Sequence, residues 1–598
     1  MTLLAEPAVA VTLPAHAQPG ARRPTPGQVE TLFVLPAVLW WAFPLTHATG
    51  GRAPYGLAVE LLLLFVAAAA TRPWRRLPHT VPLLGGALGV CAVAVCALSP
   101  TGWAGADDAA GYAAAGLALP IAAAWARTSA RRATLAAAVV LAGLDQLSHA
   151  LLPWWGGRDP SVRLVGTFYW HNPFAAYLLP AALLGLGLLV WRVRPVQAAG
   201  WVAAPACAAG VVLSTSRATL ALLLLGWVVV GAAAVLAREG RLRRGLRWLV
   251  VSGVAVAVTY GLPGPPLFTH RVSPFAATAA RSTSGETLTS NGGYRLQFWR
   301  EALASWAHHP LAGGGYHGLI ASSRPYVPIG WARSNYAHNG YLQALTDGGV
   351  LLALPFLLGC AWLGLLAVRR CRDAIRGGQV EPAVLVAAVS LLAGLAHSAV
   401  DFDWSHASVL LEAALLGGLV VAGGGGGGGG VLVPAPRPPV WIGRAVPVLL
   451  VLAALLGAAG TAALQRTRGR AEAAKLLPAG PRAAALAAAS RDPLASDLPA
   501  RHLLDQALAQ PGTTTRAQRE TALGGTRRAA AVDAPLAVER ARLQLLDGDR
   551  EAARVTAARW LPLARRWPQL AIGEAALLSS LGQPGVAGSG QRSPHGQR

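Results

Sequence analysis

The side chains best suited to chemistry stand together in the segment 336–350, YAHNGYLQALTDGGV, where a long apolar run begins. An imidazole that is neutral near pH 7 can accept a proton from a hydroxyl nucleophile, so His338 is a candidate general base. Helical spacing also aligns His338 with Leu342 and Leu345, and the same ring could be a packed residue at a helix end. The residues alone leave both interpretations open.

Two arginines stand where a cation is unfavourable. Arg217 separates two apolar runs, and a charge at such a boundary either serves a function or snorkels to the interface. Arg295 falls in the first turn of a helix predicted at 294–308, where the helix dipole disfavours a cation. This placement indicates a bound anion, although helical arginines are usually only solvated.

Other common chemistries lack their motifs. The sequence contains no P-loop, no HExxH, and no DxD-type carboxylate pair in a soluble sugar-nucleotide domain. The segment 313–318 fits GxGxxG, but it follows no buried strand and opens no βαβ unit, so we exclude a dinucleotide site. Its glycines are predicted to end the helix at 294–308. The five cysteines have neither zinc-site nor disulfide spacing. We therefore expect no cofactor and no metal.

The composition that must position these groups is that of a membrane protein. Hydrophobic residues make up 54% of the chain and charged residues 13%, whereas a soluble domain carries about 25% charged residues. The net charge of +24 could suit nucleic acid. We exclude that partner because the arginines form short clusters between apolar runs and no single basic face.

About thirteen runs reach the length of a membrane-spanning helix. Because spanning segments must satisfy their own backbone and these runs lack the alternation of a barrel, we predict an all-α polytopic protein. The predicted spans are 29–47, 54–71, 80–99, 108–126, 133–152, 172–191, 198–214, 218–237, 246–262, 341–366, 381–399, 407–421 and 445–464.

The arginines also predict the orientation of the chain. Clusters recur in alternate loops, near 72–76, 127–132, 192–194, 238–247 and 369–376, and the loops between them carry few. The positive-inside rule then places the clustered loops and the N-terminus in the cytoplasm. The longest loop, 263–340, and the short turns at Ser216-Arg217 and Asp401–His406 are therefore expected outside.

Three domains follow from this topology. Residues 1–28 are expected to be a cytoplasmic tail and not a cleaved signal peptide. Residues 29–464 form the polytopic domain, with a flexible Gly/Pro linker at 423–439. Residues 465–598 are expected outside, with a disordered end; 533–581 resembles a tetratricopeptide helix pair around Asp547-Gly548-Asp549, and 483–510 could be a weaker copy. An unspecialised helical cap fits the same pattern.

Several segments, in order, resemble the O-antigen ligase and polymerase superfamily. The segment at His338 is similar to the family's H-N-x-x-L-x-x-L-x-x-x-G signature at the end of a long outer loop. The likeness covers about 160–410, and its strength is the ordered set because each motif is degenerate. The other segments are Arg163–Phe168 with Asn172–Ala175, Ser216-Arg217, Tyr294–Leu303 with His309–Gly315, and His397–Phe402.

The resemblance implies a metal-independent, inverting glycosyl transfer in the bacterial inner membrane. The donor would be an undecaprenyl-diphosphate-linked glycan, and the acceptor a hydroxyl on lipid A core, on a growing chain or on a protein. Arg217 and Arg295 would bind the diphosphate, and His338 would orient or deprotonate the acceptor. Substrate contacts are expected from Arg163, Asn172, Asn339, Arg300, His397 and Asp401.

Two departures and three alternatives accompany this interpretation. The chain adds the region beyond 465, and it has Asn172-Pro173 where many members have a different neighbour. A polymerase of the same superfamily would need more outer cations, which Arg271, Arg281, Arg324 and Arg333 could supply. A polysaccharide transporter would need ionisable groups inside its spans, such as Asp145, Glu412 and Glu60, and internally repeated halves, which we do not find. An assembly scaffold would depend on the region beyond 465, which could also bind a protein partner.

Overall fold

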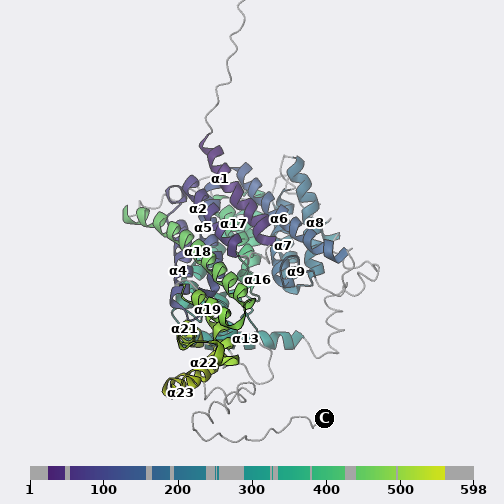
Figure 1. The fold of residues 1–598 in the computed structure, drawn as a ribbon. Coiled ribbons are helices and arrows are strands. Elements are labelled where there is room, and N and C mark those ends of the chain that lie inside the picture. Colours follow the sequence, from purple (N-terminus) through teal and green to yellow (C-terminus); the bar gives the residue numbers. More distant parts are fainter. Residues whose placement is uncertain are drawn as a thin grey trace, which may run out of the picture.

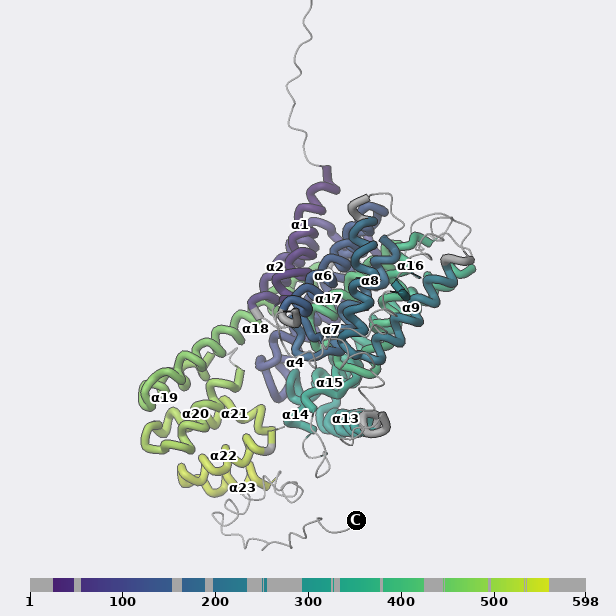
Figure 2. Tube along the Cα trace, turned by 90° about the vertical axis from the view of Figure 1, so that its right-hand side faces the viewer, coloured from purple at the N-terminus to yellow at the C-terminus, as the bar shows by residue number. Residues whose placement is uncertain are grey.

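The computed structural model describes residues 25–47, 54–155, 164–188, 194–236, 250, 252–254, 288–323, 326, 334–376, 380–423, 440–492, 496–531 and 533–558. Within these ranges the chain is all-α, with no strand (Figure 1). The predicted fold class is therefore confirmed. One end of the molecule carries the start of the first helix, and the other carries the C-terminal helices (Figure 2).

Every predicted span except 246–262 coincides with a described helix, and most of 246–262 lies outside the described residues. Seven of the described helices are long and apolar enough to cross a membrane, and three shorter ones are also apolar. The helices of the membrane domain are α1 (Pro26–Trp40), α2 (Pro54–Thr71), the short α3 (Pro73–Arg76), α4 (Thr80–Leu98), α5 (Ala106–Trp125), α6 (Ser129–Trp155), α7 (His171–Leu188), α8 (Arg194–Ser214), α9 (Arg217–Leu236), α15 (Gly340–Ile375), α16 (Pro382–Ser398), α17 (Ala407–Ala422) and the first part of α18 (Val440–Lys475).

Two helices form the centre of the bundle. All residues of α5 are buried except Asp108, and all residues of α7 are buried except Asn172. The backbones of α4 and α5 touch where Gly85 meets Gly116, because a Cβ on either glycine would lie 2.1–2.3 Å from the other's carbonyl oxygen. Small residues permit such close packing between membrane helices. The exceptions, Asp108 and Asn172, stand in the first turns of their helices, and each belongs to a polar cluster at that end of the bundle.

Helix α15 is broken inside the membrane domain. Gly349 has φ +57° and ψ −157°, so the helical path is interrupted there. The outer loop fills the break: the amides of Gly314 and Gly315 donate to the carbonyls of Thr346 and Asp347 (2.8 and 3.0 Å), and those of Val350 and Leu351 donate to Pro310 and Leu311 (2.9 and 3.0 Å). The loop thereby supplies backbone partners that the broken helix would otherwise lack.

The glycines of this loop are required by its geometry. Gly313 has φ +65°, and a Cβ there would lie 2.5 Å from the Thr346 carbonyl oxygen. A Cβ on Gly349 would lie 2.4 Å from Leu311. The segment 313–318 therefore serves helix packing, in keeping with the exclusion of a dinucleotide site, and the helix before it ends at His308.

The long loop contributes α13 (Leu288–His308) and α14 (Leu319–Ser322). Helix α13 lies across the end of the bundle (Figure 1). Its apolar residues lie in different environments: Leu296 and Leu303 are exposed, whereas the indole of Trp299 donates to the His338 carbonyl oxygen. The exposed leucines keep α13 compatible with a membrane surface.

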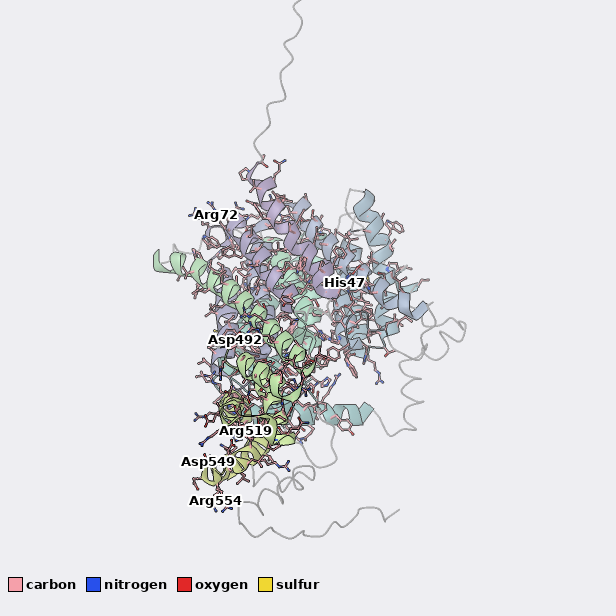
Figure 3. All side chains as sticks on the ribbon, in the orientation of Figure 1. His47, Arg72, Asp492, Arg519, Asp549 and Arg554 are labelled. Atoms are coloured by element: carbon pink, nitrogen blue, oxygen red, sulfur yellow. The ribbon has the colours of Figure 1, made fainter. Side chains whose placement is uncertain are left out.

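The region after α18 forms a separate layer of short helices at the same end as α13 (Figure 2). Figure 3 places Arg72 near one end of the molecule, and Arg519, Asp549 and Arg554 near the opposite end. Gly548, with φ +83°, turns the chain between α22 and α23, the two helices that the sequence predicts on either side of this position. The helices are α19 (Ala479–Ser490), α20 (Leu498–Ala509), α21 (Arg516–Thr526), α22 (Ala534–Leu546) and α23 (Arg550–Ala558).

Candidate active site at the Asp401 turn

A buried carboxylate in the turn between α16 and α17 gathers residues from four parts of the chain. The Asp401 side chain is only 1% exposed. It accepts hydrogen bonds from the Phe402 amide (2.8 Å) and the Asn172 amide group (2.5 Å). Arg295 Nη2 lies 3.5 Å from one of its oxygens, and His338 Nδ1 lies 3.6 Å from the other. The structure thus brings together four of the predicted site residues.

This environment keeps Asp401 ionised. Burial opposes the charged form, but the adjacent imidazoles of His338 and His397 and the Arg295 guanidinium outweigh it and lower the pKa of Asp401 to about 2. A buried charge is stable only when partners of this kind surround it. Asp401 is therefore an anionic hub at any working pH.

The His338 ring is held in an unusual backbone conformation. Its φ is +49°, a left-handed conformation that costs a side-chain-bearing residue roughly 1–3 kcal/mol. The ring stacks on Phe298 (5.4 Å between centroids) and meets the edge of Phe402 (5.0 Å). Its Nδ1 is buried toward Asp401, yet the side chain is 20% exposed. The ring nitrogen that does not face Asp401 is Nε2.

One face of α13 builds most of this environment. Arg295, Phe298 and Trp299 follow an i, i+3, i+4 spacing, which places them on neighbouring positions of one helix face. Arg295 reaches Asp401, Phe298 supports the His338 ring, and the Trp299 indole donates to the His338 carbonyl oxygen at 3.3 Å. The R-x-x-x-W pattern of the sequence therefore corresponds to contacts with two segments, the Asp401 turn and the His338 segment before α15.

Aromatic rings extend the site beyond the imidazole. Tyr336 and Phe402 stack with centroids 4.2 Å apart and planes 8° from parallel. Tyr169 joins this stack at 6.3 Å from Phe402 and is 47% exposed. We call these three residues the aromatic platform; Phe402 is buried, and Tyr169 and the half-buried Tyr336 provide its accessible area near His338.

Arg217 and His397 belong to a neighbouring network. His397 is fully buried, with Nδ1 2.5 Å from Asp403 and Nε2 2.9 Å from the Thr219 hydroxyl. Thr219 in turn contacts Ser216 at 2.8 Å, just before Arg217 begins α9. His397 therefore links the start of α9 to the Asp401 turn, and this arrangement holds the position at which Arg217 begins α9.

The remaining predicted residues are placed differently. The Asn339 side chain caps α15, accepting from the amides of Tyr341 and Leu342 at 3.0 Å and donating to the Ala399 carbonyl at 2.8 Å. These contacts occupy both ends of its amide group. Arg300 is exposed on α13 and lies five positions after Arg295, so it points about 140° away from it around the helix. Arg163 lies outside the described residues.

A second polar cluster stands at the same end of the bundle. His317 Nε2 lies 2.7 Å from Asp108 and 3.8 Å from Asp107, and Arg468 of α18 lies 3.8 Å from Asp107. The Asp108 charge raises the pKa of His317 well above its usual value, despite opposition from desolvation. This cluster joins the outer loop, α5 and the start of the C-terminal region by charged contacts.

Sequence reasoning missed the platform and the role of Asp403. Tyr169, Tyr336 and Phe402 all lie within or beside motifs that carried the resemblance, but aromatic residues near a membrane surface are common and carry no signal alone. By its sequence context Asp403 fits an ordinary turn residue, whereas its carboxylate is buried against His397. Burial and the nearby Asp401 charge raise the pKa of Asp403, against the opposing effect of His397.

Comparison with known proteins identifies one region. Residues 202–357 match the family model described as O-Antigen ligase. The matched stretch contains Arg217, Arg295 and His338, and it ends before Asp401. No curated protein matches the chain.

Proposed function

The chain belongs to the O-antigen ligase superfamily, and from that premise we propose that it transfers a glycan from an undecaprenyl-diphosphate carrier to an acceptor hydroxyl. The membrane fold and the family support a membrane enzyme of the ligase or polymerase type. The observation that carries the more specific proposal is the Asp401 hub, which holds an imidazole and a guanidinium side by side.

His338 is proposed as the general base. Asp401 faces Nδ1 of the ring, so it favours the tautomer with the proton on Nδ1 and leaves Nε2 free to accept one. The acceptor hydroxyl would give its proton to Nε2 as its oxygen attacks the anomeric carbon. The bond from that carbon to the diphosphate oxygen breaks on the opposite face, which gives inversion.

Arg295 and Arg217 are proposed to stabilise the leaving diphosphate. One Arg295 nitrogen faces Asp401, and the side chain is 36% exposed, so other N–H donors of the guanidinium can bind a phosphate oxygen. Fixed cations stabilise the charge that develops on the diphosphate as the glycosidic bond breaks. Arg217 begins α9, so its charge lies at the boundary where a lipid-linked diphosphate would sit.

The aromatic platform is proposed to hold a sugar ring of the donor or acceptor. Tyr169 and Tyr336 offer apolar faces and hydroxyl groups next to the imidazole, and rings of this kind present one apolar side and one polar tip. A sugar placed there would bring a hydroxyl within reach of Nε2 and would reduce the search for a productive geometry.

We place this site on the extracytoplasmic face of the inner membrane. The arginine clusters of alternate loops support that orientation, which also puts the N-terminus in the cytoplasm. The C-terminal helices lie at the same end as α13 (Figure 2), and we propose that this tetratricopeptide-like region binds a protein partner or the acceptor.

The decisive experiment uses cells in which a tagged variant replaces the native chain. His338→Ala, Arg295→Ala and Arg217→Ala are expected to accumulate carrier-linked glycan and to lose the transferred product, at equal protein levels. His308→Gln is the matched control, because His308 is exposed at the end of α13 and stacks on Tyr326. Unchanged lipid and product pools in all three variants would refute the transferase and favour transport or scaffolding.

The product separates the two members of the class. Glycan found on lipid A core or on a protein would identify a ligase. Glycan added to a second carrier-linked chain would identify a polymerase of the same superfamily. The four arginines that could serve a second carrier, Arg271, Arg281, Arg324 and Arg333, lie outside the described residues.

A further inference from the structure

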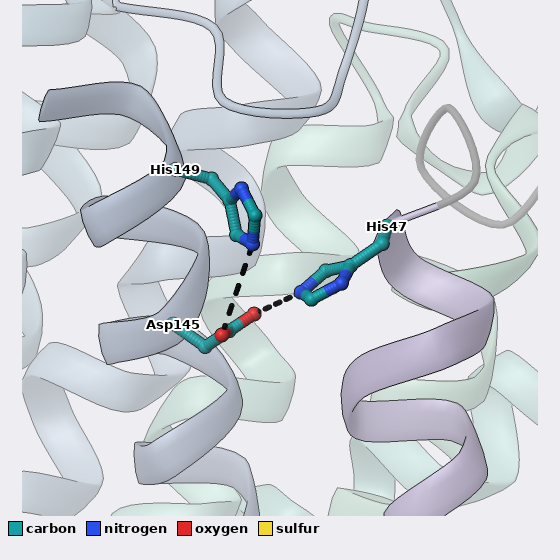
Figure 4. Close-up of side chains that lie close together, drawn as sticks. All are labelled: His47, Asp145 and His149. Carbon is teal, nitrogen blue, oxygen red and sulfur yellow. Dashed lines mark hydrogen bonds and ion pairs between the residues drawn. The ribbon is translucent and has the colours of Figure 1, made fainter. Parts of the chain in front are cut away.

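We propose that His47, Asp145 and His149 form a binding site for one divalent transition-metal ion of the zinc type. The three side chains converge between the end of α1 and the outer part of α6 (Figure 4). They share no residue with the Asp401 site. The inference is therefore independent of the proposed glycosyl transfer.

The donor atoms are already close to a ligand arrangement. One ligand atom of each residue lies within 4.8 Å of both others. His47 Nε2 contacts one Asp145 oxygen, and His149 Nε2 lies 4.0 Å from the other. The centroids of the two imidazole rings are 4.2 Å apart. A tetrahedral zinc ion with bonds of about 2.0–2.1 Å would need only side-chain rotations to draw these atoms together.

The sequence builds the site from two helical features. Asp145 and His149 are an i, i+4 pair on α6 and so occupy one face of the helix, a spacing that suits two ligands of one metal. His47 comes just after the π-helical segment η1 (Trp41–Leu45). A π turn holds an extra residue, which rotates the residues after it by about 100° relative to a regular helix. The π turn thus sets the direction in which His47 leaves the helix.

The charge of the cluster favours a cation. With both imidazoles neutral, the form in which histidine binds a metal, the cluster carries a net charge of −1. Within the described part of the chain the ion pairs and ring contact of these side chains run among themselves. The cluster of Asp107, Asp108 and His317 has similar ligand types, but its two carboxylates face two cations: Arg468, 3.8 Å from Asp107, and His317, whose pKa the Asp108 charge raises well above its usual value. Of these two clusters in the described residues, the first alone combines such ligands with an unbalanced negative charge.

The ligand set also selects the metal. Imidazole nitrogen suits zinc, copper, nickel and iron, whereas magnesium and calcium prefer cages of oxygen. The side chains of His47, Asp145 and His149 are 35%, 23% and 42% exposed, so an ion can enter and water can take the remaining position. Three protein ligands with one open position is a common zinc arrangement.

The position of the site indicates a structural clamp. The Thr167 hydroxyl lies 2.7 Å from the Thr46 carbonyl and 2.8 Å from the Gln146 amide oxygen. Thr46 and Gln146 are the sequence neighbours of His47 and Asp145. A metal bound by these residues would therefore strengthen the contact between α6 and the segment that follows η1. The same contact holds Thr167, in the turn that precedes Tyr169 of the aromatic platform.

The test is metal stoichiometry of the purified full chain, carrying a tag without histidines and stripped with EDTA. After dialysis against zinc chloride, elemental analysis should give one more zinc ion per chain in the native protein than in His47→Gln or His149→Gln. Zinc should also raise the melting temperature of the native protein and leave that of His149→Gln unchanged, because a ligand that binds only the folded state stabilises it.

The matched controls are His317→Gln and Asp108→Asn in the second cluster, which should keep the zinc. Asp145→Asn repeats the test with a near-isosteric change if a histidine variant fails to fold. Equal zinc content in the native protein and all three cluster variants would overturn the site. Equal stabilisation of the native protein by magnesium would also overturn it, because this ligand set discriminates against that ion.

Discussion

Two histidines at the same end of the molecule have similar backbone conformations and similar partners but differ in which ring nitrogen meets the carboxylate. His338 and His317 both stand in loop segments, both have positive φ (+49° and +57°), and both face aspartates. In His317 the contacting nitrogen is Nε2, which is held by Asp108 at 2.7 Å. In His338 the carboxylate faces Nδ1 instead, at 3.6 Å, and the side chain is 20% exposed. An imidazole is a candidate general base when the carboxylate faces Nδ1, as in His338. It has a structural role when the carboxylate holds Nε2, as in His317.

The surroundings sharpen this difference. Asp401 also holds a guanidinium, Arg295, whose side chain is partly exposed. Asp107, beside His317, holds Arg468, which ties α18 to the bundle. Each cluster includes the single residue of a central helix that is not buried, Asn172 in α7 and Asp108 in α5. One cluster contains a partly exposed guanidinium, and the other links α18 to the bundle through its charged contacts.

The largest effect is expected from exchanging the base. His338→Gln should lower the transfer rate by about 10²–10⁴-fold, the usual contribution of a general base, whereas His317→Gln should change it by less than about tenfold. Initial rates in proteoliposomes with a carrier-linked donor measure both. Similar losses in the two variants would mean that both histidines are structural.

A smaller but still clear effect is expected from the carboxylates. Asp401→Asn keeps the shape of the hub but removes the charge that orients His338 and Arg295, so the rate should fall by roughly 10–10³-fold. Asp108→Asn should leave the rate near native and reduce thermal stability. If Asp108→Asn were slower than Asp401→Asn, the roles assigned to His338 (general base) and His317 (structural) would have to be reversed.

The break in α15 at Gly349 offers a test of the structural contacts at this end of the molecule. Gly349→Ala places a Cβ 2.4 Å from Leu311 in a left-handed conformation, and we expect the melting temperature to drop by roughly 3–10 °C. Gly480→Ala is the control, because nothing lies within 4 Å of that position and its backbone is helical. A Gly349→Ala protein as stable as the control would show that the loop does not depend on the break.

The smallest effect is a dependence of stability on pH. The pKa of His317 is raised in the folded protein. Its contribution to the free energy of unfolding is therefore complete below about pH 6.5 and is lost as the pH rises through the folded-state pKa. The melting temperature of the native protein should exceed that of His317→Gln by about 1–3 °C at pH 6, and by less at about pH 9 or above; the difference is small because the side chain is exposed. A difference that grew with pH would contradict the charged pair.

The fold was largely accessible from the sequence because the length of an apolar run acts locally. A run such as 133–152 predicts its own helix, since no partner is needed to satisfy its backbone. The break in α15 was not accessible, because Gly349 lies in an apolar run and is shaped by hydrogen bonds from a loop distant in sequence. Local patterns cannot report a contact of that kind.

The candidate site shows the same division. Residue types and motif order could single out His338, Arg295, Asn172 and Asp401, because each stands in a recognisable segment. Their common contact could not be derived, since Asn172 and Asp401 are 229 residues apart in sequence. The resemblance implies substrate contacts for Asn339 and His397, which stay a prediction. In the structure the Asn339 side chain caps α15, and the buried His397 ring links α16 to α9.

The loop that patches α15 limits how this protein can be re-engineered. Residues 310–315 and 346–351 exchange backbone hydrogen bonds in both directions, so neither segment has its final conformation without the other. A chimera with the outer loop of a relative and the membrane helix of this protein would combine two segments that are not matched to each other. Specificity should therefore be transplanted with the loop and the first part of α15 as one cassette, or by exchanging individual side chains on the aromatic platform.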